Sequence, residues 1–327
     1  MKIVVVGSGA IGSLYGGLML RAGASVTLVG RTAHIEAIKS GGLKITGVMG
    51  EHLLHPDATV DVKRIREADF VFITTKTYDT DVAAESIRHL SDSGAYIVVL
   101  QNGIGTEKTV ADLLGTRRVL RATTCAGALK IRPGEVNVTG RGVTEIGTHY
   151  PENRAAVQTV MALLAKAGFD VCSSDNIEGL VWTKTIVNCG INPVGALTGM
   201  TNGEIHNNAL LRGVVIKLVE EAVAVVRALG VSLTTDDPIR YTLGTAKATS
   251  KNTNSMLQDF QNGRRTEIDA ITGTVVRLGR QLGVPTPVSE SMYGLIRAIE
   301  SKYLEQGRRA TTRLLTVPEL IAAVATS

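Results

Sequence analysis

The amino-acid sequence predicts an α/β protein in which a doubly wound, parallel sheet is followed by an all-helical domain. Two observations support this fold class. As far as about residue 174, short apolar runs that suit strands alternate with segments of helical spacing, a pattern typical of parallel sheets. From Asp175 onward only helical spacing continues. We therefore expect two domains, at residues 1–174 and 175–327, each long enough to bury its own core.

The elements of the first domain follow from these patterns in chain order. Apolar runs rich in β-branched side chains predict strands at Lys2–Val6, Ser25–Val29, Phe70–Thr74, Ala95–Leu100 and Phe169–Cys172. Helical spacing predicts helices at Ala10–Ala22, Asp79–Leu90 and Asn153–Ala167. The segment Arg118–Thr148 is rich in Val, Thr and Gly and carries turn signals, among them Pro133-Gly134. We expect it to form a meander that closes the edge of the sheet.

The second domain shows apolar residues at helical spacing, with glycine where a helix would end. Helices are predicted at Asn208–Leu229, Thr266–Leu282 and Pro287–Leu304. Gly230 and Gly283 directly follow the first two of these segments, and glycine is a common stop signal just past a helix end.

Composition and charge narrow the class of function. The net charge is +5 with Lys and Arg spread along the chain, so nucleic-acid binding is only weakly indicated and an anionic small molecule suits the charge equally well.

Cys125, Cys172 and Cys189 form no C-x-x-C pair, which argues against a disulfide framework or zinc ribbon and fits a reducing cytosol. The opening MKIVVVGSG leaves no room for a signal peptide, and no uncharged run is long enough to span a membrane. We expect a cytoplasmic protein with no membrane or nucleic-acid partner. His52 and His55 match no metal motif, so no metal is expected.

A glycine-rich motif lies between the first predicted strand and the first predicted helix. It has the form G-x-G-x-x-G and consists of Gly7, Ser8, Gly9, Ala10, Ile11 and Gly12. In this context the first glycine permits a tight turn, the second lets the backbone approach a pyrophosphate, and the third lets helix and strand pack closely. The free N–H groups at the helix start would then face the phosphates. A Rossmann-type dinucleotide site is favoured over the alternative, a glycine-rich turn that binds no ligand.

The end of the second strand indicates which dinucleotide is bound. An NAD-binding chain usually places Asp or Glu there for the ribose 2′-hydroxyl, but Val26–Thr32 contains no acid. Arg31 can instead form a charged fork with a 2′-phosphate. We therefore predict NADP as the cofactor. The alternative is a solvated surface arginine.

Two further loops follow strands at their carboxyl ends, where ligands of such sheets bind. Lys76, in the run Thr-Thr-Lys, is either a surface charge or a cation that reaches a phosphate. Asn102 precedes Gly103 in Q-N-G, and it either shapes a turn or contacts a ligand near the nicotinamide.

A line of polar residues crosses an apolar segment of the second domain. Lys184, Asn188 and Asn192 recur every four residues, so a helix presents them on one face. A lysine in a partly dry cleft holds its proton less tightly and is a better proton donor near neutral pH, and asparagines beside it could orient a substrate. The alternative is an amphipathic helix with a solvated polar face. Pro193 disfavours helix at the residue before it, so we expect the helix to end there.

An ordered set of motifs resembles the ketopantoate reductase (2-dehydropantoate 2-reductase) family over nearly the full length. The motifs are GSGAIG, TTK, QNGIG, K-x-x-x-N-C-x-I-N-P with N-G-E at Asn202–Glu204, and S-M-L-Q-D with T-E-I-D downstream. The set is far more specific than the glycine motif alone. The resemblance implies an NADPH-dependent enzyme with a Rossmann domain and a helical domain. It also implies a branched 2-oxo acid as substrate, with ketopantoate reduced to pantoate on the route to pantothenate and coenzyme A.

The resemblance also implies roles for individual residues. Lys184 is expected to donate the proton to the 2-oxo group, while Glu267 touches the cofactor and supports that lysine. Substrate contacts are implied for Asn102, Lys184, Asn188, Asn192, Asn202 and Ser255. Cofactor contacts are implied for Arg31 and Lys76 at the 2′-phosphate, for Asn102, for Glu267, and for the backbone near Gly127. Without the resemblance, Ser255 and Glu267 would pass as a helix-surface residue and a first-turn acid.

Two other functions stay open at this point. One is a D-2-hydroxyacid dehydrogenase of the same superfamily that acts on other branched 2-oxo acids, usually with NAD; Arg31 argues against it. The other is a non-catalytic NADP-binding regulator, which would need neither Lys184 nor Glu267. Cys189 is expected to be a buried small hydrophobe, and Arg308, Arg309 and Arg313 a solvated end. The tail after Gln306, through Leu314–Val324, extends beyond what the resemblance implies and leaves the oligomeric state open, with a homodimer as one candidate.

Overall fold

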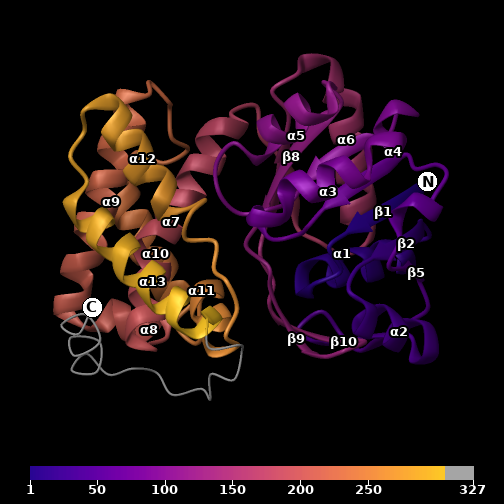
Figure 1. Cartoon of the computed structure of the whole chain (residues 1–327), viewed down its shortest axis with the longest axis horizontal. Coiled ribbons are helices and arrows are strands. Elements are labelled where there is room, and N and C mark those ends of the chain that lie inside the picture. The colour runs from indigo at the N-terminus through magenta and orange to yellow at the C-terminus, as the bar shows by residue number, and fades with distance from the viewer. Residues whose placement is uncertain (306–327) are drawn as a thin grey trace. The chain divides into compact units, whose positions relative to one another are not determined.

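The computed structural model describes residues 1–305, and the chain divides into two compact units, one ending at Ile177 and the other beginning at Glu178 (Figure 1). The predicted fold class is confirmed, since a largely parallel sheet forms the first unit and helices form the second. The predictions for the tail after Gln306, including Arg308, Arg309, Arg313 and Leu314–Val324, lie outside the described residues.

An eight-stranded sheet forms the centre of the first unit. In spatial order its strands are β12 (Val171–Ser173), β11 (Thr144–Gly147), β8 (Val119–Thr124), β7 (Tyr96–Val99), β6 (Phe70–Ile73), β1 (Lys2–Val6), β2 (Ser25–Val29) and β5 (Asp57–Thr59). All neighbours are parallel except β8 and β11. The carboxyl ends of β1, β2, β6 and β7 therefore meet at one edge, which is where such sheets bind ligands.

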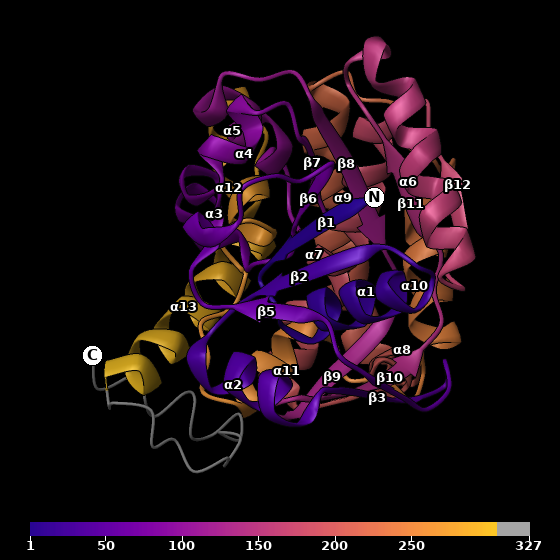
Figure 2. The same ribbon diagram turned by 90° about the vertical axis from the view of Figure 1, so that its right-hand side faces the viewer.

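Both faces of this sheet are covered, which explains why its central strands are apolar without alternation. Ile3 and Val5 of β1 belong to one core, while Val4 and Val6 belong to the core on the opposite face. Figure 2 shows α3 to α5 on one side of the sheet and α1 with α6 on the other. The helices are α1 (Ala10–Arg21), α2 (Thr32–Gly41), α3 (Thr80–Ser86), α4 (Arg88–Asp92), α5 (Thr106–Leu114) and α6 (Arg154–Lys166), with short 3-10 turns η1 (Val62–Arg64), η2 (Thr77–Asp79) and η3 (Pro151–Asn153).

Helix α1 lies between the large sheet and a second, four-stranded sheet (Figure 2). The second sheet has the order β4 (His52–Leu54), β3 (Leu43–Gly47), β10 (Glu135–Gly140), β9 (Gly127–Arg132). Two adjacent glycines of α1 make room for the two sheets. A Cβ on Gly16 would lie 2.4 Å from the Leu28 side chain of the large sheet, and one on Gly17 would lie 2.6 Å from Ile45 of the small one. Helix α1 is consequently buried on both sides.

Two expectations for the first unit need correction. The segment Arg118–Thr148 does not form one meander along the edge of the large sheet. Its strands β9 and β10 belong to the small sheet, where β10 pairs in parallel with β3. Val136 and Val138 of β10 thereby enter the core around α1. The expected helix Asp79–Leu90 is also interrupted: α3 ends at Ser86, and Ile87 leaves helical geometry before α4 begins.

The second unit is helical in the part that the structure describes. Its helices are α7 (Ile177–Thr198), α8 (Asn202–Asn207), α9 (Ala209–Ala228), α10 (Pro238–Ala248), α11 (Ser255–Gln261), α12 (Thr272–Leu282) and α13 (Pro287–Glu305). Helix α9 packs against α8, α10, α12 and α13 (Figure 1). Helix α7 approaches α9 closely at Gly190, where a Cβ would lie 3.0 Å from Val219.

Two expected helix ends in this unit are wrong. Helix α7 continues through Pro193 to Thr198. An interior proline costs about 3 kcal/mol, and the buried residues that follow it, Val194 and Ala196, offset that loss. Helix α12 begins at Thr272 and not at Thr266, because Ile271 has a non-helical backbone and residues 266–271 form a separate loop.

Candidate functional site

The loops that follow β1, β2 and β6 are bonded to one another at the carboxyl edge of the large sheet. The N–H groups of Gly7 and Ser8 both donate to the Val29 carbonyl, each at 3.0 Å. The Thr74 hydroxyl donates to the Gly7 carbonyl at 2.9 Å. The structure therefore brings the glycine motif together with the end of β2 and with the Thr-Thr-Lys loop.

The three glycines of the motif differ in backbone conformation and in the space available for a side chain. Gly7 has φ +102, and a Cβ there would lie 2.5 Å from the Thr75 nitrogen. A Cβ on Gly12 would lie 2.4 Å from the Gly7 carbonyl oxygen. Gly9 has φ −75, which any residue adopts, and a Cβ there would meet no protein atom closer than 3.8 Å. Packing explains Gly7 and Gly12, whereas Gly9 borders open space of the kind a closely approaching ligand would use.

The helix that begins at Ala10 presents a positive end to this space. No side chain caps α1 at Gly9, and its first turn holds no acid. Helix N-termini with free N–H groups attract phosphate through hydrogen bonds and the helix dipole. The residues here fit a dinucleotide pyrophosphate, which Ala10, Ile11 and Gly12 would hold through their backbone N–H groups.

Arg31 lies beside this space at the end of β2. Its side chain is exposed, and it is the N-cap residue of α2, whose first turn also lacks an acid. Gly30, just before it, contacts the glycine motif so closely that a Cβ would lie 1.9 Å from the Ser8 hydroxyl oxygen. The backbone therefore holds Arg31 next to the motif, while its side chain stays accessible.

Gln101 joins the Thr-Thr-Lys loop to the Gln-Asn-Gly loop. Its buried amide nitrogen donates to the Thr75 carbonyl at 3.1 Å and lies 3.4 Å from the Lys76 carbonyl oxygen. Lys76 and Asn102, both half-buried, are therefore brought to the same edge. Sequence reasoning assigned Gln101 no role. The available signal was a polar residue just past the apolar strand β7, separated from it only by Leu100.

A buried arginine on the neighbouring strand bonds to the Gln-Asn-Gly loop. Sequence reasoning missed this arginine as well. Arg121 on β8 is 2% exposed and donates to the Gly103 carbonyl at 2.8 Å. It also forms an ion pair with Glu107 at 3.3 Å. Burial by itself raises the pKa of Glu107, but the hydrogen bond with His149 and the charge of Arg121 outweigh it and hold that pKa below its usual value.

Gly127, predicted near the nicotinamide, begins β9. A Cβ there would lie 2.6 Å from the Thr139 hydroxyl oxygen, so packing against β10 already requires glycine. Its predicted cofactor contact stays a prediction.

A buried histidine supports the glycine motif through a chain of hydrogen bonds. His34 of α2 accepts the Gly134 N–H at Nδ1, so its Nε2–H donates to the Ser13 hydroxyl at 2.9 Å. The Ser13 hydroxyl in turn donates to the Ser8 carbonyl at 3.2 Å. Only the neutral ring can accept the Gly134 N–H at Nδ1. Burial, together with the nearby Lys130 charge, lowers the pKa of His34 to about 4.

The low pKa of His34 predicts acid sensitivity. Unfolding lets the imidazole bind a proton below its usual pKa of 6.5, whereas the folded protein resists protonation down to about pH 4. Stability is therefore full above pH 6.5 and falls between 6.5 and 4. The expected loss at pH 5 is about 2 kcal/mol relative to pH 7.5. Urea unfolding of the wild type and of His34→Gln measures it, because the variant lacks this part of the pH dependence. If the free energy of unfolding depends on pH equally in the wild type and in the variant, the prediction is contradicted.

Helix α7 carries the predicted catalytic line of the second unit. Lys184 and Asn188 are half-buried and Asn192 is buried, while Trp182 and Ile186 on other faces are buried in the core. The helical spacing places the three polar residues on one face of α7, which is half-buried at Lys184 and Asn188 and buried at Asn192.

Thr183 fixes α7 next to Lys184. Its hydroxyl donates to the Gly179 carbonyl at 2.8 Å and accepts the Thr234 N–H at 3.0 Å. The helix therefore cannot rotate or slide without breaking a contact to the 231–237 loop.

Two other predicted substrate residues begin helices near one another in the second unit. Asn202 opens α8, where Thr201 and Glu204 form a capping box, and its N–H donates to the Asn252 carbonyl at 3.0 Å. The Asn202 amide nitrogen donates to Thr249, while its buried oxygen has no hydrogen-bond partner among the described residues. Ser255 opens α11.

Asn254 connects this region to α7. It is the N-cap residue of α11, and its amide nitrogen approaches α7 so closely that a Cβ on Gly195 would lie 2.1 Å away. Sequence reasoning overlooked Asn254; an Asn directly ahead of a helical run was the available signal.

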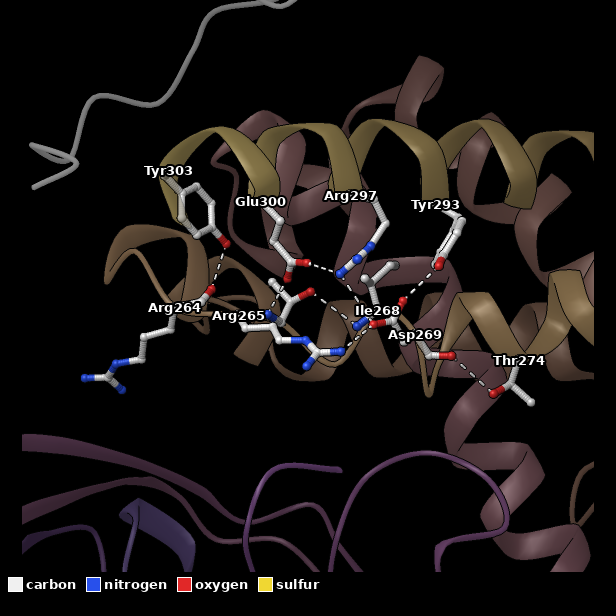
Figure 3. Close-up of polar contacts among 10 residues, drawn as sticks. Arg264, Arg265, Ile268, Asp269, Thr274, Tyr293, Arg297, Glu300 and Tyr303 are labelled. Atoms are coloured by element: carbon white, nitrogen blue, oxygen red, sulfur yellow. Dashed lines mark hydrogen bonds and ion pairs between the residues drawn. The ribbon is translucent and has the colours of Figure 1, made fainter. Parts of the chain in front are cut away.

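The loop that carries Glu267 is held against α13 (Figure 3). Glu267 is buried, and its neighbours Thr266 and Ile268 are fully buried. Its carbonyl accepts the N–H groups of Ala270 and Ile271, each at 3.1 Å. Glu267 is therefore a loop residue ahead of α12, and the simple interpretation as a first-turn acid is wrong.

Other features of the described residues concern metals, cysteines and membranes. No group of three or more His, Cys, Asp and Glu side chains could hold a metal ion in the described part of the chain. Cys189 is buried as expected, and burial raises its pKa to about 12. Among residues 1–305, no helix is both long and apolar enough to cross a membrane.

The predicted residues form two sets, one in each unit. The glycine motif, Arg31, Lys76 and Asn102 gather at one sheet edge, and Lys184, Asn188 and Asn192 share one face of α7. Asn202, Ser255 and Glu267 lie on three further segments of the helical unit. Their ligand contacts stay predictions.

Comparison with known proteins identifies the family. The model of the ketopantoate reductase PanE/ApbA family matches residues 3–151, and the model of its C-terminal domain matches residues 176–300. A 2-dehydropantoate 2-reductase of Pyrococcus horikoshii is 37% identical over 92% of this chain and 98% of its own length. The corresponding protein of Halobacterium salinarum is 33% identical over 91% and 98%.

Solved structures agree with these relatives. A PanE/ApbA family ketopantoate reductase from Ralstonia eutropha JMP134 has a TM-score of 0.86 and 33% identity, covering 93% of this chain and 100% of that one. D-Mandelate dehydrogenase, solved with NADH and anilino(oxo)acetate, has a TM-score of 0.87 and 25% identity over the same shares. Two matched family models, relatives over most of the chain and shared architecture lead to one conclusion: this chain belongs to the ketopantoate reductase family, whose members are pyridine-nucleotide-dependent oxidoreductases.

Proposed function

We propose that the protein reduces 2-dehydropantoate to (R)-pantoate with NADPH, as a step toward pantothenate and coenzyme A. The observation that carries the proposal is the face of α7, where Lys184, Asn188 and Asn192 lie in line in a member of this family. Membership of an enzyme family argues against a non-catalytic regulator.

The proposed mechanism divides the reaction between cofactor and protein. When bound in the first unit, NADPH would supply the hydride that the carbonyl carbon needs. Lys184 donates a proton to the carbonyl oxygen and stabilises the negative charge that develops there. Asn188 and Asn192 orient the oxo acid, with Asn102, Asn202 and Ser255 as further contacts. Glu267 supports Lys184 and touches the cofactor.

Turnover of a panel of 2-oxo acids tests the proposal. The full-length protein is expected to oxidise NADPH fastest with 2-dehydropantoate, with a kcat/KM well above that for 2-oxoisovalerate or benzoylformate. Preference for one of the other acids would reject 2-dehydropantoate as the substrate.

A second candidate is a D-2-hydroxyacid dehydrogenase of the same superfamily. The likeness to D-mandelate dehydrogenase, which was solved with NADH, favours it, while the absence of an acid at the end of β2 argues for NADPH. The same panel run with NADH separates the two candidates, since this alternative predicts faster turnover of another branched 2-oxo acid, usually with NADH.

Arg31 is expected to determine the preference for NADPH. Arg31→Ala removes the charged partner of the 2′-phosphate, and hydrogen bonds to charged groups contribute about 1.5–3 kcal/mol. The Kd for NADPH is therefore expected to rise roughly 10- to 100-fold while that for NADH changes little. Binding titrations followed by nicotinamide fluorescence measure both values. Arg64→Ala, which removes an exposed arginine on η1, serves as the matched control and should change neither Kd.

Equal weakening of NADPH binding and NADH binding by Arg31→Ala would show that Arg31 does not contact the 2′-phosphate.

A homodimer and a cytoplasmic location stay predictions, which light scattering and cell fractionation test.

A further inference from the structure

Helix α13 presents one polar face to the loop that contains Glu267 (Figure 3). Tyr293, Arg297, Glu300 and Tyr303 follow one another at intervals of three or four residues, so they share one side of the helix. The opposite partner is the loop of residues 264–271, which precedes α12. A helix far along the chain therefore has a polar side dedicated to this loop.

The contacts fall on both sides of Glu267. Before it, the Thr266 N–H donates to the Glu300 carboxylate, and the Tyr303 hydroxyl donates to the Arg264 carbonyl at 2.7 Å. After it, the Tyr293 hydroxyl donates to the Asp269 carboxylate at 2.8 Å. The backbone on either side of Glu267 is consequently tied to α13.

Glu300 is the centre of this arrangement. It is 1% exposed, and besides the Thr266 N–H it pairs with Arg297 at 2.9 Å. Arg297 also reaches Asp269, at 3.5 Å. One buried carboxylate thus bonds to the residue before Glu267 directly and to the residue two beyond it through Arg297. A hydrogen bond from a buried N–H to a charged acceptor is stronger than one between neutral groups.

The loop has little freedom to absorb a change at Glu300. The Ile268 N–H donates to the Thr266 hydroxyl at 3.2 Å, and the Glu267 carbonyl holds the turn into residues 270 and 271. A shift of the Thr266 backbone would therefore move Glu267 with it. Misplacing a catalytic group by about 1 Å can lower a rate by about 100-fold.

We propose that Glu300 is a positioning residue that sets the place of Glu267. The proposal rests on the proposed role of Glu267 in catalysis and cofactor contact. Glu300 acts through the Thr266 N–H and through Arg297, so its effect on the reaction passes through Glu267.

A double-variant cycle in the full-length protein tests this. Glu300→Gln is expected to lower kcat roughly tenfold, and Glu267→Gln to lower it at least as much. The double variant is expected to be no slower than Glu267→Gln alone, within a factor of about two, because residues that act as a unit are not additive. Losses that multiply in the double variant, or a kcat unchanged by Glu300→Gln, would overturn the proposal.

Glu290→Gln is the matched control. Glu290 lies on the same helix and pairs with Arg280 at 3.1 Å, away from the loop. It should leave kcat unchanged. Glu300→Asp, which keeps the charge, should recover part of the activity lost in Glu300→Gln, whereas a loss caused by general unfolding would lower the thermal midpoint and the kcat together.

A second cycle, on NADPH affinity, needs no substrate. Glu300→Gln and Glu267→Gln should each weaken NADPH binding, and the double variant should bind no more weakly than Glu267→Gln. If the wild type reduces no 2-oxo acid, the proposed function fails, while this cycle still decides whether Glu300 acts through Glu267. Additive weakening, or none in Glu300→Gln, overturns the positioning role.

Discussion

Replacing Lys184 with alanine is expected to lower kcat for 2-oxo acid reduction by about 1,000-fold, within the 10²–10⁴ range of general acid catalysis. The variant loses the group that donates the proton and that stabilises the charge forming on the carbonyl oxygen. The fold should persist, because alanine suits a helix interior and α7 is held by buried residues such as Trp182 and Ile186. Binding of NADPH should persist too, since the predicted dinucleotide contacts lie mainly in the first unit.

Stopped-flow measurement of NADPH oxidation with saturating 2-dehydropantoate gives kcat, and fluorescence titration gives the NADPH affinity. Lys247→Ala, which removes an exposed lysine on α10, is the matched control and should retain wild-type turnover. Turnover of Lys184→Ala within tenfold of the wild type would remove Lys184 from its role as proton donor. A parallel loss of NADPH binding would instead indicate a disturbed fold.

The sequence predicted the central strands well because their own residues determine them. Lys2–Val6 and Ser25–Val29 have the predicted bounds, since both faces of the sheet are covered and the runs are mostly apolar after their first residue. Helix α1 was likewise expected within one residue of its observed end. The glycine motif could be placed because strand, loop and helix are adjacent in the chain.

Elements that depend on distant partners could not be predicted in this way. Strand β10 lies in the small sheet, where it pairs with β3, about ninety residues earlier in the chain. Helix α12 begins at Thr272 because Ile271 leaves helical geometry, and the preceding loop is bonded through the Thr266 N–H to Glu300, which lies on a helix later in the chain. No local pattern records either partner.

The buried polar residues of the site were missed for a related reason. Gln101 and Arg121 both bond to backbone carbonyls, those of Thr75 and Gly103 among them. A carbonyl is present at every residue, so the acceptors leave no pattern in the sequence. The chain's own side-chain motifs indicated the predicted ligand contacts, whereas the residues that hold those contacts in place appeared only with the fold.

Replacing Arg121 with methionine is expected to lower the free energy of unfolding by about 3–5 kcal/mol, the usual effect of breaking a buried ion pair. Methionine fills much of the space, but Glu107 then loses its buried partner at 3.3 Å and the Gly103 carbonyl loses its donor. Arg132→Met is the matched control, because its ion pair with Glu135 is largely exposed on the arginine side and should contribute no more than about 1 kcal/mol. Urea unfolding curves of the three proteins measure the differences.

The double variant Arg121→Met with Glu107→Gln distinguishes the ion pair from simple packing. Removing both charges avoids an unpaired buried carboxylate, so the double variant should be more stable than Arg121→Met alone. The Gly103 carbonyl stays without its donor in both, and Asn102 beside it should therefore bind less well, raising the KM for NADPH in both variants equally. If the double variant is as unstable as the sum of the two single changes, the buried pair does not stabilise the loop through its charges, and Arg121 acts through its hydrogen bond to the Gly103 carbonyl and by filling space beneath the loop.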